Sequence, residues 1–201
     1  MNKKIAWQEV SRAKVFKTRV FEVAETRCRP PSAGEGKSGE GKAGEESVFS
    51  VIESRDWAIV IPVLELAGNE RAFVMVRQWR HGALEESLEF PGGVVETGEA
   101  GAEGARRELR EETGYRAGKI TKLATMSPNP AIMNNRIHFF LAEELCFEGE
   151  QHLDKDEFVT VEIHNEAEVL RAMGEPPYIH ALMAAALVFY LRKNTGTLPS
   201  G

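Results

Sequence analysis

The segment Gly92–Tyr115, GGVVETGEAGAEGARRELREETGY, constrains the fold of this chain more than any other stretch. It holds six glutamates and three arginines. Its glycines mark Gly92–Gly98 as a loop, whereas Ala100–Glu112 consists mostly of good helix formers. Gly114 follows at the point where a helix needs a residue in the left-handed conformation. The sequence therefore predicts a strand, a glycine loop, a helix and a glycine stop.

The carboxylates of the predicted helix are not spaced like a solvated face. Glu108, Glu111 and Glu112 stand at i, i+3 and i+4, which places them on one side of the helix. Like charges at this spacing destabilise an isolated helix by roughly a few tenths of a kcal/mol per pair. Bound divalent cations would relieve this repulsion, and Mg²⁺ and Mn²⁺ prefer carboxylate oxygen. We therefore expect a cation site on this face.

The same segment carries a spaced pattern of glycine, glutamate, arginine and apolar residues. The pattern G-x5-E-x7-R-E-U-x-E-E-x-G-U, with U a bulky apolar residue, resembles the signature of the Nudix hydrolases. The resemblance implies an α/β fold, an α/β/α sandwich with a mixed sheet, and hydrolysis of a nucleoside diphosphate linked to another moiety. The matching positions are Gly93, Glu99, Arg107, Glu108, Leu109, Glu111, Glu112, Gly114 and Tyr115.

The resemblance also implies a role for each acidic residue. Glu108 and Glu112 would be the main ligands of Mg²⁺, with Mn²⁺ as an alternative ion. Glu111 would be either a further ligand or the base that activates water. The backbone carbonyl of Gly92, just before the first signature glycine, would complete the metal shell.

Two further groups complete the predicted catalytic set. The first is Arg107. The resemblance implies that Arg107 and Glu99 orient the metal ligands and do not touch the substrate. A late loop of these enzymes usually supplies another carboxylate. Alignment on the expected strand Phe158–Ile163 puts Glu157 at that place, with Asp156 beside it. Glu157 is therefore a candidate general base, and the alternative is a solvated loop charge.

Residues on both sides of the signature narrow the resemblance. The stretches VRQWR (Val76–Arg80) and LEFPGG (Leu88–Gly93), the proline-bearing loop Ser127–Pro130 and the stretch DKDEFVTVEI resemble ADP-ribose pyrophosphatases and related nucleoside-diphosphate-sugar hydrolases. One position departs from that group. These enzymes commonly have an acid in the loop after the signature where this chain has Asn135, which leaves nucleotide sugars other than ADP-ribose open.

Candidate substrate contacts precede the signature. Arg77 and Arg80 are candidates for binding phosphate through their planar guanidinium groups, and the alternative is an ion pair with a nearby carboxylate. Trp57 or Trp79 would stack on a base, or else lie in the core or at a dimer interface. Glu89 would hold the adenosine end of the substrate, or would be an ordinary loop carboxylate.

Three hypotheses follow for the function. The first is Mg²⁺-dependent hydrolysis of the diphosphate of ADP-ribose or a related nucleotide sugar, which gives a nucleoside monophosphate and a sugar phosphate. The second is a Nudix hydrolase for another nucleotide: a dinucleoside polyphosphate, NADH or an oxidised nucleotide. The third is a regulator that binds a nucleotide without catalysis. Because every glutamate of the signature is present, the sequence favours an enzyme.

The charge balance limits the partners of this chain. Of its 201 residues, 25 are lysine or arginine and 31 are aspartate or glutamate, which gives a formal net charge of -6. This charge argues against sequence-independent binding to nucleic acid or to an anionic membrane, and favours a small nucleotide whose charge is bridged by cations. The most apolar late segment, Ile179–Leu191, is too short to span a bilayer. With two cysteines and no signal peptide, a cytoplasmic location is expected.

The chain is expected to have two parts. Residues 1–53 form an N-terminal strand layer with a flexible glycine-rich loop at 31–47, and residues 54–201 form the hydrolase domain. In the resembling group such a layer pairs two subunits, so a homodimer is expected.

A near match to a phosphate-binding loop at Gly36–Ala43 lacks the required Ser or Thr. Strands are expected at Ala13–Glu25, Val48–Ser54, Trp57–Leu66, Arg71–Trp79, Ala117–Met126, Arg136–Glu143 and Phe158–Ile163, and helices at Glu166–Arg171 and Tyr178–Lys193.

Overall fold

The computed structural model describes residues 6–31, 45–153, 155 and 157–195. The near match to a phosphate-binding loop, most of the predicted flexible loop and Asp156 lie outside these residues. The chain divides into two compact units. The first contains the residues up to Arg55 and the segment Asn129–Asn135, and the second contains Asp56–Pro128 and the residues from Arg136 onwards. The sequence suggested a boundary after residue 53, and the observed boundary lies two residues later, after Arg55. The segment Asn129–Asn135 was expected in the hydrolase domain but belongs to the first unit.

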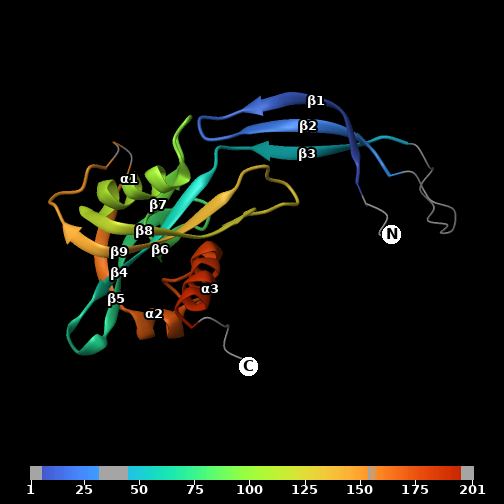
Figure 1. The fold of residues 1–201 in the computed structure, drawn as a ribbon. Coiled ribbons are helices and arrows are strands. Elements are labelled where there is room, and N and C mark those ends of the chain that lie inside the picture. The colour runs from blue at the N-terminus through green and yellow to red at the C-terminus, as the bar shows by residue number, and fades with distance from the viewer. Residues whose placement is uncertain (1–5, 32–44, 154, 156, 196–201) are drawn as a thin grey trace. The chain divides into compact units, whose positions relative to one another are not determined.

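The first unit is an antiparallel sheet of three strands in the order β1-β2-β3 (Figure 1). Its hairpin is closed by Thr18, whose hydroxyl donates to the carbonyl of Phe21 at 2.7 Å. The strand signal at Ala13–Glu25 is confirmed as part of this hairpin, although both strands are longer than expected. The strands are β1 (Gln8–Lys17), β2 (Glu22–Arg29) and β3 (Ser47–Glu53).

The second unit is built around a mixed sheet of seven strands. The order along the main path is β10-β5-β4-β9-β8, with β6 paired to β5 and β7 paired to β4. The β4–β9 pair is parallel and the other pairs are antiparallel. The strands are β4 (Trp57–Glu65), β5 (Arg71–Arg80), β6 (Glu85–Glu89), β7 (Gly92–Val94), β8 (Tyr115–Met126), β9 (Ile137–Phe147) and β10 (Val159–Asn165).

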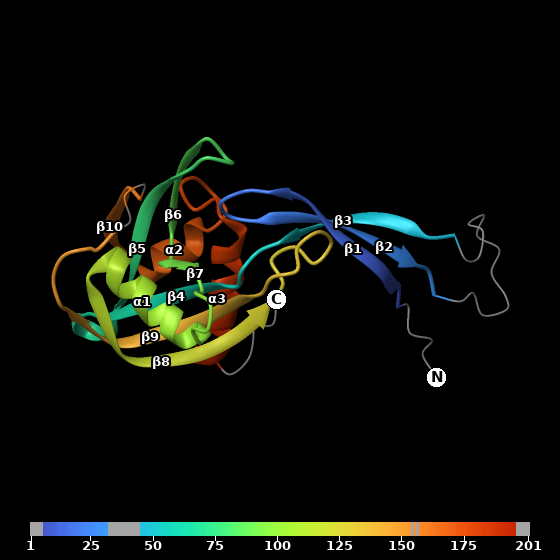
Figure 2. The same cartoon turned by 90° about the horizontal axis from the view of Figure 1, so that it is seen from above.

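Helices cover both faces of this sheet, α1 on one face and α3 on the other (Figures 1 and 2). The alternation of β4 explains the two layers, because successive side chains of a strand point to opposite faces. Ile59 and Ile61 pack with the residues of α3, whereas Ala58 and Val60 pack with α1. The predicted α/β/α sandwich with a mixed sheet is confirmed. The helices are α1 (Gly101–Thr113), α2 (Glu166–Ala172) and α3 (Ala181–Thr195).

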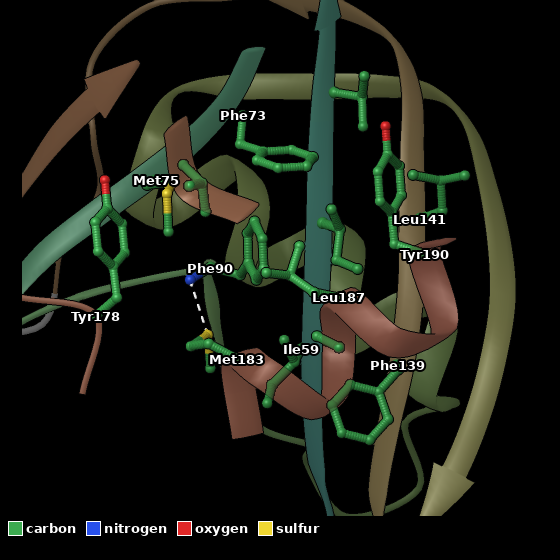
Figure 3. Close-up of a cluster of buried hydrophobic side chains, with 14 of the residues drawn as sticks. Ile59, Phe73, Met75, Phe90, Phe139, Leu141, Tyr178, Met183, Leu187 and Tyr190 are labelled. Atoms are coloured by element: carbon green, nitrogen blue, oxygen red, sulfur yellow. Dashed lines mark hydrogen bonds between the residues drawn. The ribbon is translucent and has the colours of Figure 1, made fainter. Parts of the chain in front are cut away.

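The larger core lies between the sheet and α3 (Figure 3). Phe73 makes edge-to-face contacts with Phe90 and with Tyr190 of α3, with ring centroids 5.2 Å apart in both pairs. Met183 of α3 accepts a hydrogen bond from the backbone N–H of Phe90 at 3.0 Å. This contact fixes the start of α3 against Phe90, two residues before Gly92.

Two short strands differ from the expectation. The strands β6 and β7 were not anticipated, and β7 corrects the assignment of Gly92–Gly98 as loop throughout. Gly92 and Gly93 pair with Ile59 and Ala58, so two residues with low strand propensity are held by the neighbouring strand. Gly68–Asn69 is a turn of a short 3-10 helix (Ala67–Asn69) in which both residues have positive φ. No helix among the described residues has the length and apolar character to cross a membrane.

Candidate active site

The helix α1 is fixed at both ends by interactions of the chain around it. At its start, the carboxylate of Glu103 accepts the backbone N–H of Ala100 at 3.1 Å. At its end, Gly114 has φ 72° and donates its N–H to the carbonyl of Arg110 at 2.9 Å. The backbone N–H of His152, from the loop after β9, donates to the carbonyl of Glu111 at 2.8 Å. The predicted helix and its glycine stop are therefore confirmed.

Two glycines of β7 bring the chain against the carboxylates of α1. A Cβ on Gly93 would stand 2.5 Å from an oxygen of Glu108, so any larger residue here would move that carboxylate from its present position. A Cβ on Gly92 would stand 2.3 Å from the backbone oxygen of Ala58. The N–H of Gly92 donates to the Oε2 of Glu112 at 2.9 Å. Glu108 and Glu112 therefore both lie against the Gly92–Gly93 backbone.

Glu112 is a buried carboxylate, and the groups around it do not favour its ionised form. Its residue is 5% exposed. Burial raises the pKa of Glu112 to about 8, and the charges of Glu108 and Glu157 also raise it, against the hydrogen bond from Gly92. Burial likewise raises the pKa of Glu108. Without a cation, the positive groups around Glu108 and Glu112 do not fully compensate the negative charge of the two ionised carboxylates.

Arg107 holds the remaining carboxylates of the signature in place. Its Nε and Nη2 donate to the two oxygens of Glu99 at 3.0 and 3.1 Å. Its Nη1 donates to Glu108 at 2.8 Å and to Glu111 at 3.1 Å. Nη2 also donates to the carbonyl of Val94, one residue beyond the glycine pair, at 2.9 Å. One guanidinium thus links three carboxylates to β7, as expected for a residue that orients metal ligands.

The donors at this site suit a hard divalent cation. Glu108, Glu111, Glu112 and the carbonyl of Gly92 offer oxygen alone, which Mg²⁺ and Mn²⁺ prefer. A cation beside Glu112 would also compensate the charge that burial disfavours. Within the described part of the chain, no three acidic, histidine or cysteine side chains are already arranged around one point. Arg107 donates to one oxygen of Glu108 and to one oxygen of Glu111, so a cation that bound these same oxygens would compete with its hydrogen bonds.

The structure brings Glu157 to the signature from the other end of the chain. Glu157 is exposed and directly precedes Phe158 and β10. Its charge is among the causes that raise the pKa values of Glu108 and Glu112, so Glu157 acts electrostatically on both carboxylates. Its role as a base stays a prediction.

A second feature beside the signature is a pocket formed by an ion pair and the glycine loop. Arg80 donates to both oxygens of Glu89, at 2.7 and 2.5 Å. Glu89 is 1% exposed. Its burial raises the pKa, but the hydrogen bonds and charge of Arg80 outweigh this effect, so the pKa of Glu89 lies below its ordinary value. The pocket has a volume of about 230 Å³, and its lining includes Arg80, Glu89, Gly92, Gly93, Trp57 and His180.

His180 is a pocket residue that the sequence did not reveal. Its Nδ1 accepts the backbone N–H of Leu182 at 3.1 Å, so in the neutral ring the proton is on Nε2. That nitrogen lies 4.0 Å from Glu89, and burial lowers the pKa of His180. In the sequence His180 stands far from the signature, at the start of an apolar helix, and only the packing of α3 against Phe90 brings it to the pocket.

Arg77 and Trp79 lie apart from the Arg80 pocket. Arg77 donates to Glu162 of β10 at 2.5 and 3.1 Å and lies 3.5 Å from Glu86. These bonds lower the pKa of Glu162 to about 2. Side chains alternate along β5, so Arg77 and Arg80 point to opposite faces of the sheet. Arg77 and Trp79 line a different pocket of about 410 Å³, which Glu157 also borders.

Comparisons with known proteins identify the family of this chain. A family model described as NUDIX domain matches residues 56–184. The chain belongs to the Nudix family. The solved structure of an ADP compounds hydrolase has the same fold, with a TM-score of 0.75 and 20% identity over 98% of this chain and 100% of that one.

Several curated relatives match the central part of this Nudix protein. The ADP-ribose pyrophosphatase of Bacillus subtilis is 43% identical over 94 residues, which are 46% of this chain and 51% of the relative. The methanol dehydrogenase activator of Bacillus methanolicus is 38% identical over 92 residues, 45% of this chain and 50% of the relative. The ADP-sugar pyrophosphatase of Mus musculus is 35% identical over 86 residues, 43% and 39% of the two chains. The chain thus spans about half the length, or less, of these relatives.

The close approach of Gly93 to Glu108 gives a direct test of the Nudix site. We expect Gly93→Ala to weaken Mn²⁺ binding by about tenfold or more, because the new methyl group displaces the carboxylate of Glu108, a candidate metal ligand. Isothermal titration with Mn²⁺ measures the effect. Gly82→Ala is the matched control, since a Cβ at Gly82 would meet no atom within 4 Å. Equal Mn²⁺ affinity of the Gly93→Ala variant and the unchanged protein would contradict the assignment.

Proposed function

We propose that this Nudix protein hydrolyses the diphosphate linkage of ADP-ribose or a related nucleoside diphosphate sugar, in a reaction that depends on Mg²⁺. The products are a nucleoside monophosphate and a sugar phosphate. One observation carries the proposal: Glu108 and Glu112 meet at the Gly92–Gly93 backbone, directly beside the pocket of Arg80 and Glu89. The relatives named ADP-ribose pyrophosphatase and ADP-sugar pyrophosphatase support the same substrate class.

The acidic residues would hold the cation. Glu108 and Glu112 are the main ligands in this proposal, and Glu111 and the Gly92 carbonyl complete the shell. A bound divalent ion supplies positive charge to the diphosphate oxygens and makes a coordinated water more acidic. Arg107 orients Glu108 and Glu111 through the hydrogen bonds that it makes to both. Mn²⁺ is expected to replace Mg²⁺, because both ions take oxygen ligands.

The remaining residues would position the substrate and move the proton. Glu157 accepts a proton from the attacking water in this proposal, which is supported by the electrostatic effect of its charge on Glu108 and Glu112. Arg80 binds a substrate phosphate at the pocket, and Glu89 fixes the direction of its guanidinium. Trp57 forms a wall on which a ring of the substrate rests. Phosphate contact by Arg77 remains a prediction that requires its bonds to Glu162 to open.

A substrate panel tests the proposal. With Mg²⁺ present, we expect ADP-ribose or another nucleotide sugar to be the best substrate, ahead of dinucleoside polyphosphates, NADH and oxidised nucleotides. Chromatography of the products should show a nucleoside monophosphate in equal amount with a sugar phosphate, and Glu112→Gln should abolish both. The absence of turnover for every nucleotide sugar would reject the proposed substrate class.

The role of Glu157 has its own test. We expect Glu157→Gln to lower kcat by about 100-fold or more, the usual contribution of a general base. KM and Mn²⁺ affinity should stay close to those of the unchanged protein, because the proposed role involves the water and not the binding of metal or substrate. Glu150→Gln is a control on the same connection between β9 and β10. An unchanged kcat of the Glu157→Gln variant would remove this residue from the mechanism.

We further propose that the protein is a homodimer paired through its N-terminal sheet. The support is the exposure of large apolar side chains on this unit, among them Val15 at 53%, Phe16 at 62% and Phe49 at 43%. Light scattering at micromolar concentration should give twice the mass of one chain, and a single-chain mass would reject the dimer.

A reducing compartment such as the cytoplasm is proposed as the location of the protein, since Cys28 and Cys146 are both free.

A further inference from the structure

Two arginines of α1 are spaced four residues apart, as Glu108 and Glu112 are. Arg106 and Arg110 stand at i and i+4, so their side chains neighbour one another on the helix. Like charges at this spacing destabilise a helix unless a counter-charge lies between them. With about 100° between successive residues, this pair lies roughly opposite Glu108 and Glu112. The helix therefore presents carboxylates on one side and guanidinium groups on the other.

The arginine side of α1 borders a pocket of about 510 Å³. Arg116, at the start of β8, adds a third guanidinium, and His152 adds an imidazole. The full lining is Arg106, Arg107, Arg110, Glu111, Arg116, Ala117 and His152. In a chain with a net charge of -6, this concave surface gathers cationic side chains.

The carboxylates near this pocket leave part of the positive charge uncompensated. Glu148 forms an ion pair with Arg110 at 3.8 Å and accepts a hydrogen bond from Arg116. Glu111 is held by Arg107 at 3.1 Å. Within residues 6–31, 45–153, 155 and 157–195, no acidic side chain forms an ion pair with Arg106. Among the described residues, Arg106, Arg110 and Arg116 therefore have one carboxylate between them as an ion-pair partner, that of Glu148.

The walls of the pocket are tied to one another by backbone hydrogen bonds. The N–H of His152 donates to the carbonyl of Glu111 at 2.8 Å, and the N–H of Glu148 donates to the carbonyl of Gly114 at 2.9 Å. Both bonds fasten the chain after β9 to the end of α1. The backbone positions of Arg110, Arg116 and His152 relative to one another are therefore set by the fold.

We infer that this pocket binds a phosphate group, next to the candidate metal site and not at Glu108 and Glu112. Guanidinium groups bind phosphate oxygens with two parallel hydrogen bonds, and an anion between Arg106 and Arg110 relieves their repulsion. Glu111 and Arg107 border both the pocket and the carboxylate cluster, so an occupant lies within about one helix width, 10–12 Å, of that cluster. The ligand is either free inorganic phosphate or a phosphate of the substrate remote from the cleaved linkage.

The first experiment measures binding without catalysis. Titration of the whole protein with inorganic phosphate, in EDTA and without nucleotide, should show one saturable site. Arg106→Gln combined with Arg110→Gln should weaken this binding about tenfold or more, since two charged hydrogen-bond donors are lost. Arg171→Gln, an exposed arginine of α2, is the matched control and should bind phosphate normally. Circular dichroism and thermal unfolding confirm that each variant is folded.

A further variant separates this pocket from the metal site. Glu112→Gln should leave phosphate affinity unchanged. The inference is overturned if the unchanged protein shows no saturable binding, if the arginine double variant binds as well as the unchanged protein, or if Glu112→Gln alone abolishes binding. Because no turnover is measured in this titration, its outcome does not depend on the proposed hydrolysis.

Steady-state kinetics identifies the source of the phosphate. If the pocket receives a remote phosphate of the substrate, the double variant should raise KM for 2′-phospho-ADP-ribose about tenfold and leave ADP-ribose unaffected. If the pocket receives free phosphate, both KM values should stay unchanged although the binding of inorganic phosphate is lost. Each result supports the site and assigns its occupant.

Discussion

The hydrogen bonds of Arg107 are the interaction on which the candidate site depends. This guanidinium binds Glu99, Glu108 and Glu111 and also the carbonyl of Val94, so it joins the carboxylate face of α1 to β7, the strand that contains the glycine pair. Without it, several carboxylates on one helical turn would repel one another. The interactions with Glu99, Glu108 and Glu111 all raise the pKa of Arg107, so the group stays charged at any pH at which the protein is folded.

The glycines set how closely that helix approaches the sheet. Gly93 leaves the space that Glu108 fills, and Gly92 uses its N–H to hold Glu112 in a buried position. The helix therefore presents two carboxylates at a strand edge with little room for water, where burial raises the pKa of both. Such a site gains most from a cation, and in the proposed function that cation also attracts an anionic nucleotide to an acidic chain.

Sequence reasoning recovered the parts that depend on local pattern. The spacing of Glu108 and Glu112, the glycine stop of α1 and the strand expected at Trp57–Leu66 are local signals, and each corresponds to an element of the structure. The strand β7 was missed because glycine has low strand propensity, and its pairing with β4 comes from a distant segment. His180 was missed for the same kind of reason, since tertiary packing alone brings it beside Glu89. The two possible roles of Arg77, ion pair or substrate contact, were indistinguishable until β10 was placed next to β5.

A structure of the protein with Mn²⁺, located by its anomalous scattering, tests the central claim most directly. The account predicts a metal peak between the carboxylates of Glu108 and Glu112, within bonding distance of oxygen from both, and a loosened contact between Arg107 and Glu108. A metal peak elsewhere, with Glu108 still bonded to Arg107 and Glu112 bonded to Gly92 alone, would contradict it.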